Sequence, residues 1–402
     1  MRPLSSTWVT VILGALAVAN AEQGNNWEQN PIGSDDATSQ ELVSFEPCND
    51  FPEYCELPID WSVWLGATGS GSSSIEKGLT LKDGEWIESV GDATSLSRTQ
   101  TRTVTSMLND GIRLLKVDLC SNHGEPAHVC FSDGENIGYG ATLKSFLRDS
   151  FQFLKDQPHQ ALVLHLEENP MNSVDIRQVE KVIDDVCAEL SNRTAGVFWF
   201  EAGQCPWIYT KKEISTPLPT MGELVGFDPE MAQWEGDGEL VGVRSQLIVT
   251  HSQEFIRPYG YKSNYMSQPF WQTTHGVSQD ISQVKAQLKK LCSKATAIEV
   301  EVSIAEVLSD CVDNGKCADA GTMDALNDAL YSRQGCNIET MSNYARIAAI
   351  STSFYHTKLE QIKGIQRKLL QLNEKKLSAI KLSHQQPGNS KPKNQASHHD
   401  EL

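Results

Sequence analysis

Residues 109–118 read Asn-Asp-Gly-Ile-Arg-Leu-Leu-Lys-Val-Asp, so a turn signal stands directly before a short apolar run. A short apolar run bounded by a turn is typical of a buried strand. Residues 63–67, Val-Trp-Leu-Gly-Ala, and 161–166, Ala-Leu-Val-Leu-His-Leu, have the same character. These three segments predict buried strands with chemically informative residues at or near their carboxyl ends.

Helix-like and strand-like segments alternate along the chain. Helices are expected over 98–109, 143–157, 174–190 and 281–292, and strands over 63–67, 112–119, 127–131, 161–166, 241–250 and 297–302. Strands that alternate with helices of this length predict a parallel sheet. The span 48–355 therefore fits one β/α barrel with insertions, and the active site of such a barrel lies at the carboxyl ends of its strands.

Address signals stand at both ends of the chain. Residues 1–21 have a positive start at Arg2, an apolar stretch over 9–18 and a small-x-small cleavage site over 19–21, as in a secretory signal. The last four residues, 399–402, read His-Asp-Glu-Leu, which is a retrieval signal for the endoplasmic reticulum. We therefore expect the mature chain in the lumen of the endoplasmic reticulum, where the retrieval receptor is its partner.

The segments that flank the predicted barrel are polar or basic. Residues 22–47 form an acidic leader, and 383–402 form a flexible tail that ends in the retrieval signal. Between barrel and tail, 356–382 is predicted as a basic amphipathic helix, because leucines and isoleucines recur every three or four positions. Its apolar stripe could pack on the barrel or mediate self-association, or its basic face could bind an anionic membrane or a partner.

The composition predicts a globular, acidic protein. Of the 402 residues, 39% are hydrophobic, and the formal net charge is −18. Nucleic acid is excluded as a partner, because a protein that binds phosphates along a nucleic acid needs a basic surface. The acidic balance also disfavours broad electrostatic docking on anionic lipid. No apolar run after the signal reaches the roughly 18 residues that span a bilayer, so no transmembrane segment is expected.

The ten cysteines predict disulfide bonds, because their number is even and the expected compartment is oxidising. A zinc site is the competing hypothesis, but no Cys or His group has the required spacing. The sequence leaves the full connectivity open. Local spacing favours three pairs: Cys48–Cys55, Cys120–Cys130 and Cys311–Cys317. Asn192 stands in the one Asn-X-Thr sequon, so glycosylation is expected there on a solvent-facing loop.

Several motifs of the chain resemble the phospholipase-C-like phosphodiesterases, which include the X-domain barrel of phosphatidylinositol-specific phospholipases and its fungal relatives. They stand in that family's order over about 48–250: Cys48-Asn49 with Cys55, Gly66-Ala67-x-x-Ser70, the 109–115 segment, the run from Thr142 to Glu167, and 219–224. The resemblance implies an α/β fold, a TIM barrel of the phospholipase-C type with a C-terminal helical extension. It also implies a phosphoric diester hydrolase and a phospholipid or inositol-phosphate ligand.

The family's two catalytic histidines are replaced in this chain. The resemblance aligns them with Thr68, after the first strand, and with Phe131, at the end of a later short strand. The attacking hydroxyl must lose a proton and the leaving alkoxide must gain one, and imidazole suits both tasks. Neither replacement can transfer a proton at neutral pH. Each general acid or base contributes about 10²–10⁴-fold in rate, so the catalytic site is expected to be degenerate.

The calcium-ligand positions implied by the resemblance are also altered. They hold Gly69, Lys116, Asp118 and Glu167, so Asp118 and Glu167 alone retain carboxylates. Calcium takes six to eight oxygen ligands, and this set is incomplete. Lys116 could instead neutralise a phosphate directly, as a basic residue does in the metal-independent members of the family.

Strand alternation places Lys116 with Asp118, and His165 with Glu167, on one face of each strand. Two interpretations follow. A rewired phosphodiesterase site from these four residues could act on an inositol lipid or a lipid anchor. A buried ion pair of Lys116 with Asp118 or Glu167, in a barrel that binds or scaffolds without catalysis, is the favoured one. Arg113 matches a strand-start arginine of the family and is interpreted as mainly structural.

Two further histidines are candidate site residues. Alternation aims His128 away from the face on which Phe131 lies, so it is a poor substitute for a catalytic histidine. His251 ends a predicted strand and could line the barrel mouth, but a surface-loop position is favoured.

Overall fold

The computed structural model describes residues 47–74, 79–80, 86–87, 100, 102–121, 127–132, 137–168, 174–193, 203, 205, 207–210, 218–226, 228–234, 240–243, 246–252, 261–273, 286, 289–290, 297–302, 337, 346–353 and 355–385. The predicted signal, the leader up to 46 and the retrieval signal lie outside this set, as do Cys311 and Cys317. The predicted helix over 281–292 is represented by 286 and 289–290, which are helical.

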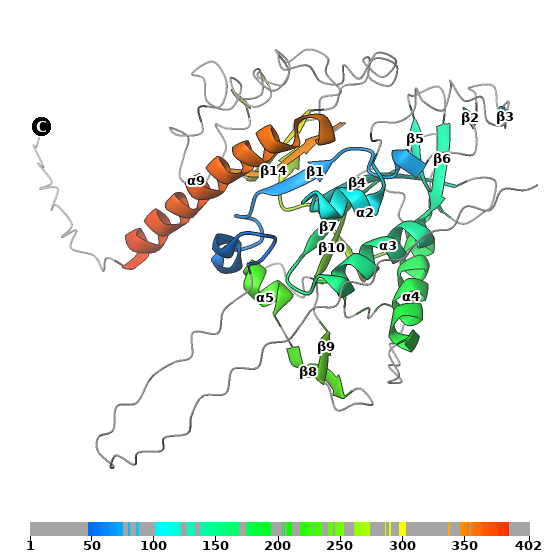
Figure 1. Ribbon diagram of the computed structural model, residues 1–402, viewed down its shortest axis with the longest axis horizontal. Coiled ribbons are helices and arrows are strands. Elements are labelled where there is room, and N and C mark those ends of the chain that lie inside the picture. The colour runs from blue at the N-terminus through cyan, green and yellow to red at the C-terminus, as the bar shows by residue number, and fades with distance from the viewer. Residues whose placement is uncertain are drawn as a thin grey trace, which may run out of the picture. The chain divides into compact units, whose positions relative to one another are not determined.

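The central sheet is a curled parallel sheet whose strands follow one another in chain order (Figure 1). The parallel pairs run in chain order from β1 through β4, β7 and β10 to β11, and from β12 through β13 to β14, and β14 pairs in parallel with β1. Among the described residues, no pairing joins β11 to β12. The strands are β1 (Trp64–Ala67), β4 (Leu114–Cys120), β7 (Leu162–Glu168), β10 (Leu247–His251), β11 (Met266–Ser267), β12 (Gln272–Thr273), β13 (Ala297–Val302) and β14 (Arg346–Thr352).

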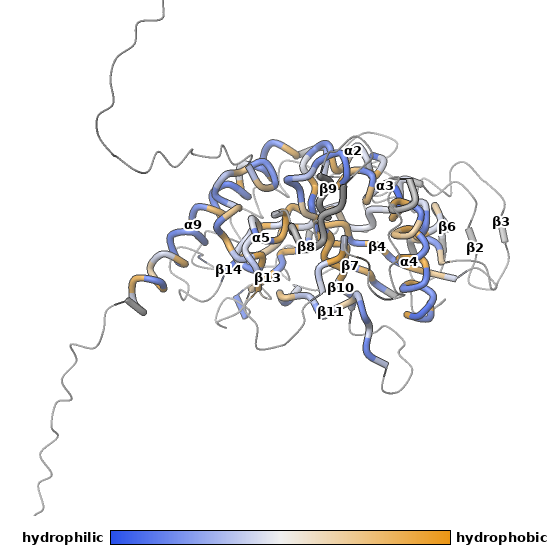
Figure 2. The backbone as a smooth tube through the Cα atoms, turned by 90° about the horizontal axis from the view of Figure 1, so that it is seen from below, coloured by the Kyte–Doolittle hydropathy of each residue, from blue (hydrophilic) through white to orange (hydrophobic). Residues whose placement is uncertain are grey.

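Return of the last strand to the first is the topology of a β/α barrel, here with an open seam between β11 and β12. The predicted fold class, an α/β barrel with a C-terminal helix, is confirmed in this form. Side chains of the parallel strands are almost all buried, and the tube in Figure 2 is mainly orange along β7 and β10. Burial on both faces explains why these strands appear in the sequence as continuous apolar runs.

An antiparallel extension leaves the carboxyl half of β4. It consists of β5 (His128–Ser132), β6 (Ile137–Thr142), β2 (Leu79–Thr80) and β3 (Trp86–Ile87). A separate hairpin pairs β8 (Asp228–Trp234) with β9 (Leu240–Val243). The prediction of one strand over 241–250 was therefore wrong, since β9 and β10 are different strands. Gln246 directly precedes β10, and its buried amide donates hydrogen bonds to the carbonyls of Gln157, Pro158 and Gln160.

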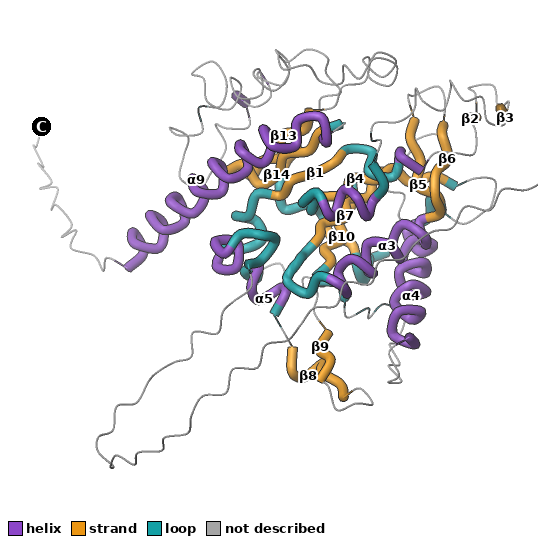
Figure 3. Tube along the Cα trace, viewed as in Figure 1, coloured by secondary structure: helices purple, strands orange, loops and turns teal. Residues whose placement is uncertain are grey.

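Four of the helices begin or lie close to where the sequence predicts them (Figure 3). They are α2 (Val104–Asn109), α3 (Leu143–Asp156), α4 (Ile176–Arg193) and α9 (Leu359–Gln385). The helix expected from residue 98 starts later because Thr103 caps α2, accepting from the Ser106 amide. A short helix, α5 (Met221–Val225), begins with a capping box of Thr220 and Glu223. The 3₁₀ turns are η1 (Pro52–Glu56), η2 (Ser72–Ser74) and η3 (Tyr355–Lys358).

Disulfide bonds join three pairs of the described cysteines. Cys48–Cys55 closes the segment around η1, and Cys120–Cys130 ties β4 to β5; both pairs were expected from their local spacing. The third, Cys187–Cys205, links α4 to the segment that precedes α5 in the chain and was not anticipated. Asn192, the predicted glycosylation site, lies near the carboxyl end of α4.

Helix α9 packs on β1 and β14, the strands at which the barrel closes. Its apolar stripe is buried there, and three polar residues of the helix are buried as well: Gln366, Asn373 and Lys376. The Gln366 amide donates to the Val63 carbonyl at 2.9 Å. The Asn373 amide donates to the carbonyls of Trp61 and Ile347 at 2.9 and 3.0 Å. Of the predicted alternatives, packing on the barrel is thus observed. Among the described residues, no helix has an apolar stretch long enough to cross a bilayer.

We expect Asn373→Leu to destabilise the protein by roughly 2–4 kcal/mol, because two buried carbonyls lose their donor. Urea-induced unfolding followed by tryptophan fluorescence measures the change. The matched control is Glu374→Gln, an exposed neighbour on the same helix, which should stay within about 0.5 kcal/mol of the wild type. Equal stabilities for the two variants would show that α9 is not held to the barrel by this amide.

Candidate functional site

The register between β4 and β7 brings the four predicted site residues on these strands together. Lys116 lies opposite His165, and Asp118 lies opposite Glu167. Because side chains alternate along a strand, all four belong to one face of the sheet. Asp118 and Glu167 lie in the carboxyl halves of β4 and β7, where the sites of β/α barrels are found, and Lys116 and His165 lie nearer the middle of these strands.

Lys116 is the centre of this group, and its side chain is 3% exposed. The ammonium nitrogen Nζ lies 2.6 Å from Glu301 Oε2, 3.3 Å from Glu167 Oε1 and 3.3 Å from Glu299 Oε1. The pair with Glu167 is one of the two that the sequence suggested; among the ion pairs of the described residues, Lys116 has none with Asp118. We call Lys116, Asp118, His165, Glu167, Glu299 and Glu301 the lysine cluster.

Two members of the lysine cluster, Glu299 and Glu301, were missed by the sequence analysis. Both lie on β13, which reads Ala-Ile-Glu-Val-Glu-Val and was predicted as a strand. Acidic residues two positions apart in an otherwise apolar strand were the available signal. The Glu299 carboxylate also accepts from Ser351 Oγ at 2.5 Å, Thr273 Oγ1 at 2.7 Å and Trp271 Nε1 at 2.9 Å, so it is completely buried but fully hydrogen-bonded.

Charges within the lysine cluster set the protonation states of its members. Burial would lower the pKa of Lys116, but three glutamates outweigh it and hold that pKa well above its ordinary value. Burial would raise the pKa values of Glu167 and Glu299, but Lys116 holds both below their ordinary values. Burial raises the pKa of Glu301 from 4.5 to about 7 against the attraction of Lys116.

Asp118 is the carboxyl group of the cluster that burial and Glu167 shift toward its protonated form. Burial, followed by the charge of Glu167 and a hydrogen bond to it, raises the pKa of Asp118 well above its ordinary value. At neutral pH the lysine cluster therefore holds one ammonium and two fixed carboxylates, with Glu301 titrating near neutrality, and its net charge is negative. A negative cluster at the strand ends opposes the approach of a phosphodiester.

Two buried histidines, His165 and His251, lie near the cluster. His165 Nδ1 lies 2.9 Å from Thr250 Oγ1 and Nε2 lies 3.5 Å from Glu167 Oε1. Burial, together with Lys116, lowers the pKa of His165 to about 4, so its ring is neutral at neutral pH. The favoured surface-loop position of His251 was wrong: this residue is buried on β10, with Nδ1 2.5 Å from the Ser252 carbonyl.

Thr68 and Phe131, the two positions expected from the resemblance to hold catalytic histidines, do not bring a proton carrier to the cluster. Thr68 follows β1, is buried, and its Oγ1 lies 2.9 Å from Ser353 Oγ. Phe131 lies on β5, opposite Gly138 of β6. His128 Nδ1 lies 3.1 Å from the Gly140 carbonyl and the ring packs on Tyr139, so His128 belongs to the antiparallel extension.

Arg113, the fifth residue of the predicted residual site, does not belong to the lysine cluster. It precedes β4, at the amino end of the strand, and is buried. Its guanidinium donates to Gln160 Oε1 at 2.8 Å and to the carbonyls of Leu108 and Ile112 at 2.5 and 2.9 Å, and Nη2 pairs with Asp50 at 3.3 Å. This position fits the structural role expected for it.

A calcium site from Asp118 and Glu167 does not fit this geometry. Glu167 already contacts Lys116 Nζ, and the raised pKa of Asp118 makes it a weaker anionic ligand. Within the described part of the chain, no group of three or more His, Cys, Asp or Glu residues is placed to hold a metal ion. Calcium needs six to eight oxygens, whereas the centre of this cluster is a cation.

Comparisons with known proteins give similar backbones but no close relative. No protein-family model and no curated protein sequence matches the chain. Similar solved structures include the phosphatidylinositol-specific phospholipase C of Listeria monocytogenes, at 14% identity and a TM-score of 0.45, covering 80% of this chain and 96% of that one. That of Staphylococcus aureus follows at 12% and 0.41, covering 75% and 91%. At such values these likenesses carry no information on the side chains of the site.

We expect Lys116→Met to lower the free energy of unfolding by about 3–5 kcal/mol at pH 7, because it leaves buried carboxylates without their cation. Urea-induced unfolding measures the loss. Lys181→Met is the matched control, since Lys181 is 74% exposed and pairs with Asp185 on the surface of α4. Removal of that pair should cost under about 1 kcal/mol. Equal losses in the two variants would show that Lys116 does not hold the cluster.

The raised pKa of Glu301 predicts a characteristic pH dependence of stability. Folded Glu301 retains its proton at pH values where the unfolded chain has lost it, so this group destabilises the fold progressively between about pH 4.5 and 7. The free energy of unfolding of Glu301→Gln, relative to the wild type, should rise across this window, by on the order of 1–3 kcal/mol.

The contrast is Glu299→Gln, at a group whose folded pKa is lowered. Ionised Glu299 contributes stability above the pKa of the unfolded chain, and that stability is lost as the pH falls. Its variant should therefore lose stability relative to the wild type as the pH rises. The Glu299 effect develops at and below about pH 4.5, and the Glu301 effect develops between about 4.5 and 7. Chemical denaturation from about pH 3 to 7.5 tests both; parallel pH profiles for the two variants would contradict the assignment.

Proposed function

We propose that the protein is a non-catalytic relative of the phospholipase-C-like phosphodiesterases, located in the lumen of the endoplasmic reticulum, whose barrel acts in binding or as a scaffold. The location is supported by the secretory signal over 1–21 and the retrieval signal over 399–402. The relationship is supported by the ordered motifs over 48–250 and agrees with the β/α-barrel topology.

One observation carries the non-catalytic proposal: Lys116 is buried and shared by three carboxylates. A cation that stabilises a phosphorane transition state must present its N–H groups to the phosphate oxygens. The N–H groups of Lys116 instead point into its own carboxylate ligands. The negative cluster would add repulsion to the charge that develops on the phosphate.

The imidazole group of the cluster does not act as a general acid either. A general acid must carry a proton at the working pH, and His165, with a pKa of about 4, does not. Thr68 and Phe131 stand at the family's two histidine positions, and neither side chain can accept or donate a proton at neutral pH.

A phospholipid or inositol phosphate remains the proposed class of ligand at the strand ends. The lysine cluster would bind the hydroxyl groups of such a headgroup better than its phosphate, because carboxylates accept hydrogen bonds from hydroxyls and repel anions. The retrieval receptor is the proposed protein partner through 399–402. Self-association through α9 would use its outward face, because the apolar stripe is already buried on the barrel.

One observation favours the alternative, an active phosphodiesterase with a rewired site. Asp118 and Glu167 are neighbouring carboxyl groups whose pKa values are moved in opposite directions, and Glu301 titrates near neutrality. Acid–base enzymes use pairs of this kind. On this alternative, Asp118 donates the proton and Glu167 or His165 accepts one.

A turnover assay decides between the two. We expect the purified mature chain to cleave neither phosphatidylinositol nor a generic phosphodiester above the rate of buffer alone, with or without Ca²⁺. The assay includes Lys116→Ala and Glu167→Ala, with Lys181→Ala as the surface control. Turnover by the wild type that both cluster variants lose and the control keeps would establish the rewired enzyme. Saturable binding of an inositol phosphate without turnover supports the binding role.

A further inference from the structure

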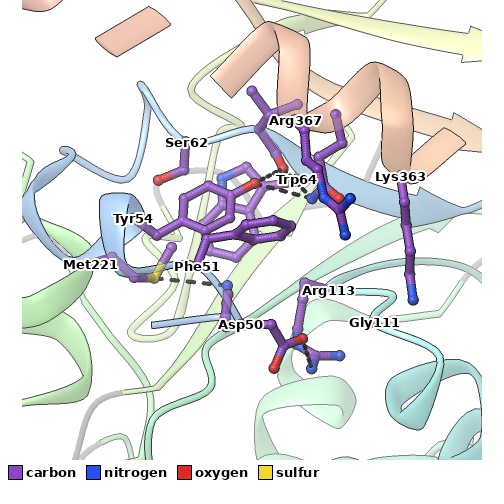
Figure 4. A pocket seen from close by; sticks show the side chains of 13 residues that line it. Asp50, Phe51, Tyr54, Ser62, Trp64, Gly111, Arg113, Met221, Lys363 and Arg367 are labelled. Carbon is purple, nitrogen blue, oxygen red and sulfur yellow. Dashed lines mark hydrogen bonds and ion pairs between the residues drawn. The ribbon is translucent and has the colours of Figure 1, made fainter. Parts of the chain in front are cut away.

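A pocket at the amino end of the barrel is distinct from the lysine cluster. It lies between η1, the start of β1 and helix α9, and has a volume of about 130 Å³ (Figure 4). Phe51 and Tyr54 supply an aromatic wall, with their rings in edge contact at 5.4 Å. The polar lining is dominated by positive charge: Arg113, Lys363 and Arg367 against Asp50.

The charge of Asp50 is already compensated inside the pocket. Its carboxylate pairs with Arg113 at 3.3 Å and accepts from Gln160 Nε2 at 3.0 Å. Two positive charges, Lys363 and Arg367, are left over. Figure 4 shows both side chains extending from α9 toward the side of the pocket where Arg113 and Asp50 lie.

The two cations on α9 have no acidic partner among the described residues. Arg367 lies over the ring of Phe51, with 5.8 Å from Cζ to the ring centre. Lys363 lies against Gly111, where an added Cβ would be 3.6 Å from its Nζ. Like charges four residues apart on one helix face destabilise a helix, and a buried arginine adds a third cation beside them. Adjacent cations without an acidic neighbour are unexpected in a chain with a net charge of −18, because acidic residues outnumber basic ones in it.

We propose that this pocket binds the phosphate group of a phosphate monoester, held by Lys363 and Arg367 beside Arg113, with the ester substituent against Phe51. Such a phosphate carries about −1.5 to −2 charges at pH 7, which matches the excess of two positive charges. Arginine and lysine form short, charge-assisted hydrogen bonds to phosphate oxygens. A carboxylate would leave one cation unbalanced. This inference goes beyond the proposed function and does not depend on the lysine cluster.

Isothermal titration calorimetry with glycerol 3-phosphate and inorganic phosphate tests the proposal on the full mature chain. Lys363→Gln/Arg367→Gln is expected to bind glycerol 3-phosphate roughly 100-fold more weakly than the wild type, since each charge-assisted contact contributes about tenfold. The matched control is Lys375→Gln/Lys381→Gln, which removes the same charge from exposed positions of the same helix. It should bind within about twofold of the wild type.

Two further measurements control for folding and distinguish the possible sources of the phosphate group. Circular dichroism establishes that each variant is folded, and Lys363→Glu alone should also abolish binding because it places an anion in the site. Phosphatidylcholine vesicles with phosphatidic acid separate the two sources of the group: co-sedimentation with the same ranking of variants supports a lipid headgroup, and binding of the soluble ester alone supports a free phosphate ester. No binding by the wild type, or equal losses in both double variants, would overturn the proposal.

Discussion

The ammonium group of Lys116, shared by Glu167, Glu299 and Glu301, is the interaction on which the barrel's interior depends. It joins β4 to its neighbour β7 and also to β13, a strand with which β4 does not pair. Burial of an ammonium is expensive unless it is paired and hydrogen-bonded, and here three acceptors meet that requirement. An apolar substitute could be equally stable, so the cluster constrains charge and shape at the strand ends as much as it stabilises the fold.

This arrangement also separates the two ends of the barrel by charge. In the lysine cluster, the ammonium group of Lys116 is paired with carboxylates that outnumber it, so the site is negative. At the amino ends, α9 is fixed by the amides of Gln366 and Asn373, and its position leaves Lys363 and Arg367 at a pocket. The family resemblance points to the first end, whereas the excess of positive charge in the described pocket lies at the second.

Periodicity predicted the fold and part of the site, because it is a local property of the chain. A period of two placed Lys116 with Asp118 and His165 with Glu167, and the register of β4 with β7 then brings these pairs together. The contacts of Glu299 and Glu301 with Lys116 could not be predicted, because β13 and β4 are not neighbours in the sheet and contacts across a barrel depend on its closure. His251 was misassigned for a related reason, since burial at a strand end depends on what packs over it.

The most direct test of this account is heteronuclear NMR of the Lys116 side-chain ammonium, assigned by comparison with Lys116→Met. A nitrogen enclosed by three carboxylates should give an ammonium resonance protected from exchange with water, unchanged when inorganic phosphate or a phosphodiester without hydroxyl groups is added at neutral pH. A signal that exchanges rapidly, or that shifts in a saturable way with the phosphodiester, would show that this cation is free to meet a substrate and would contradict the account.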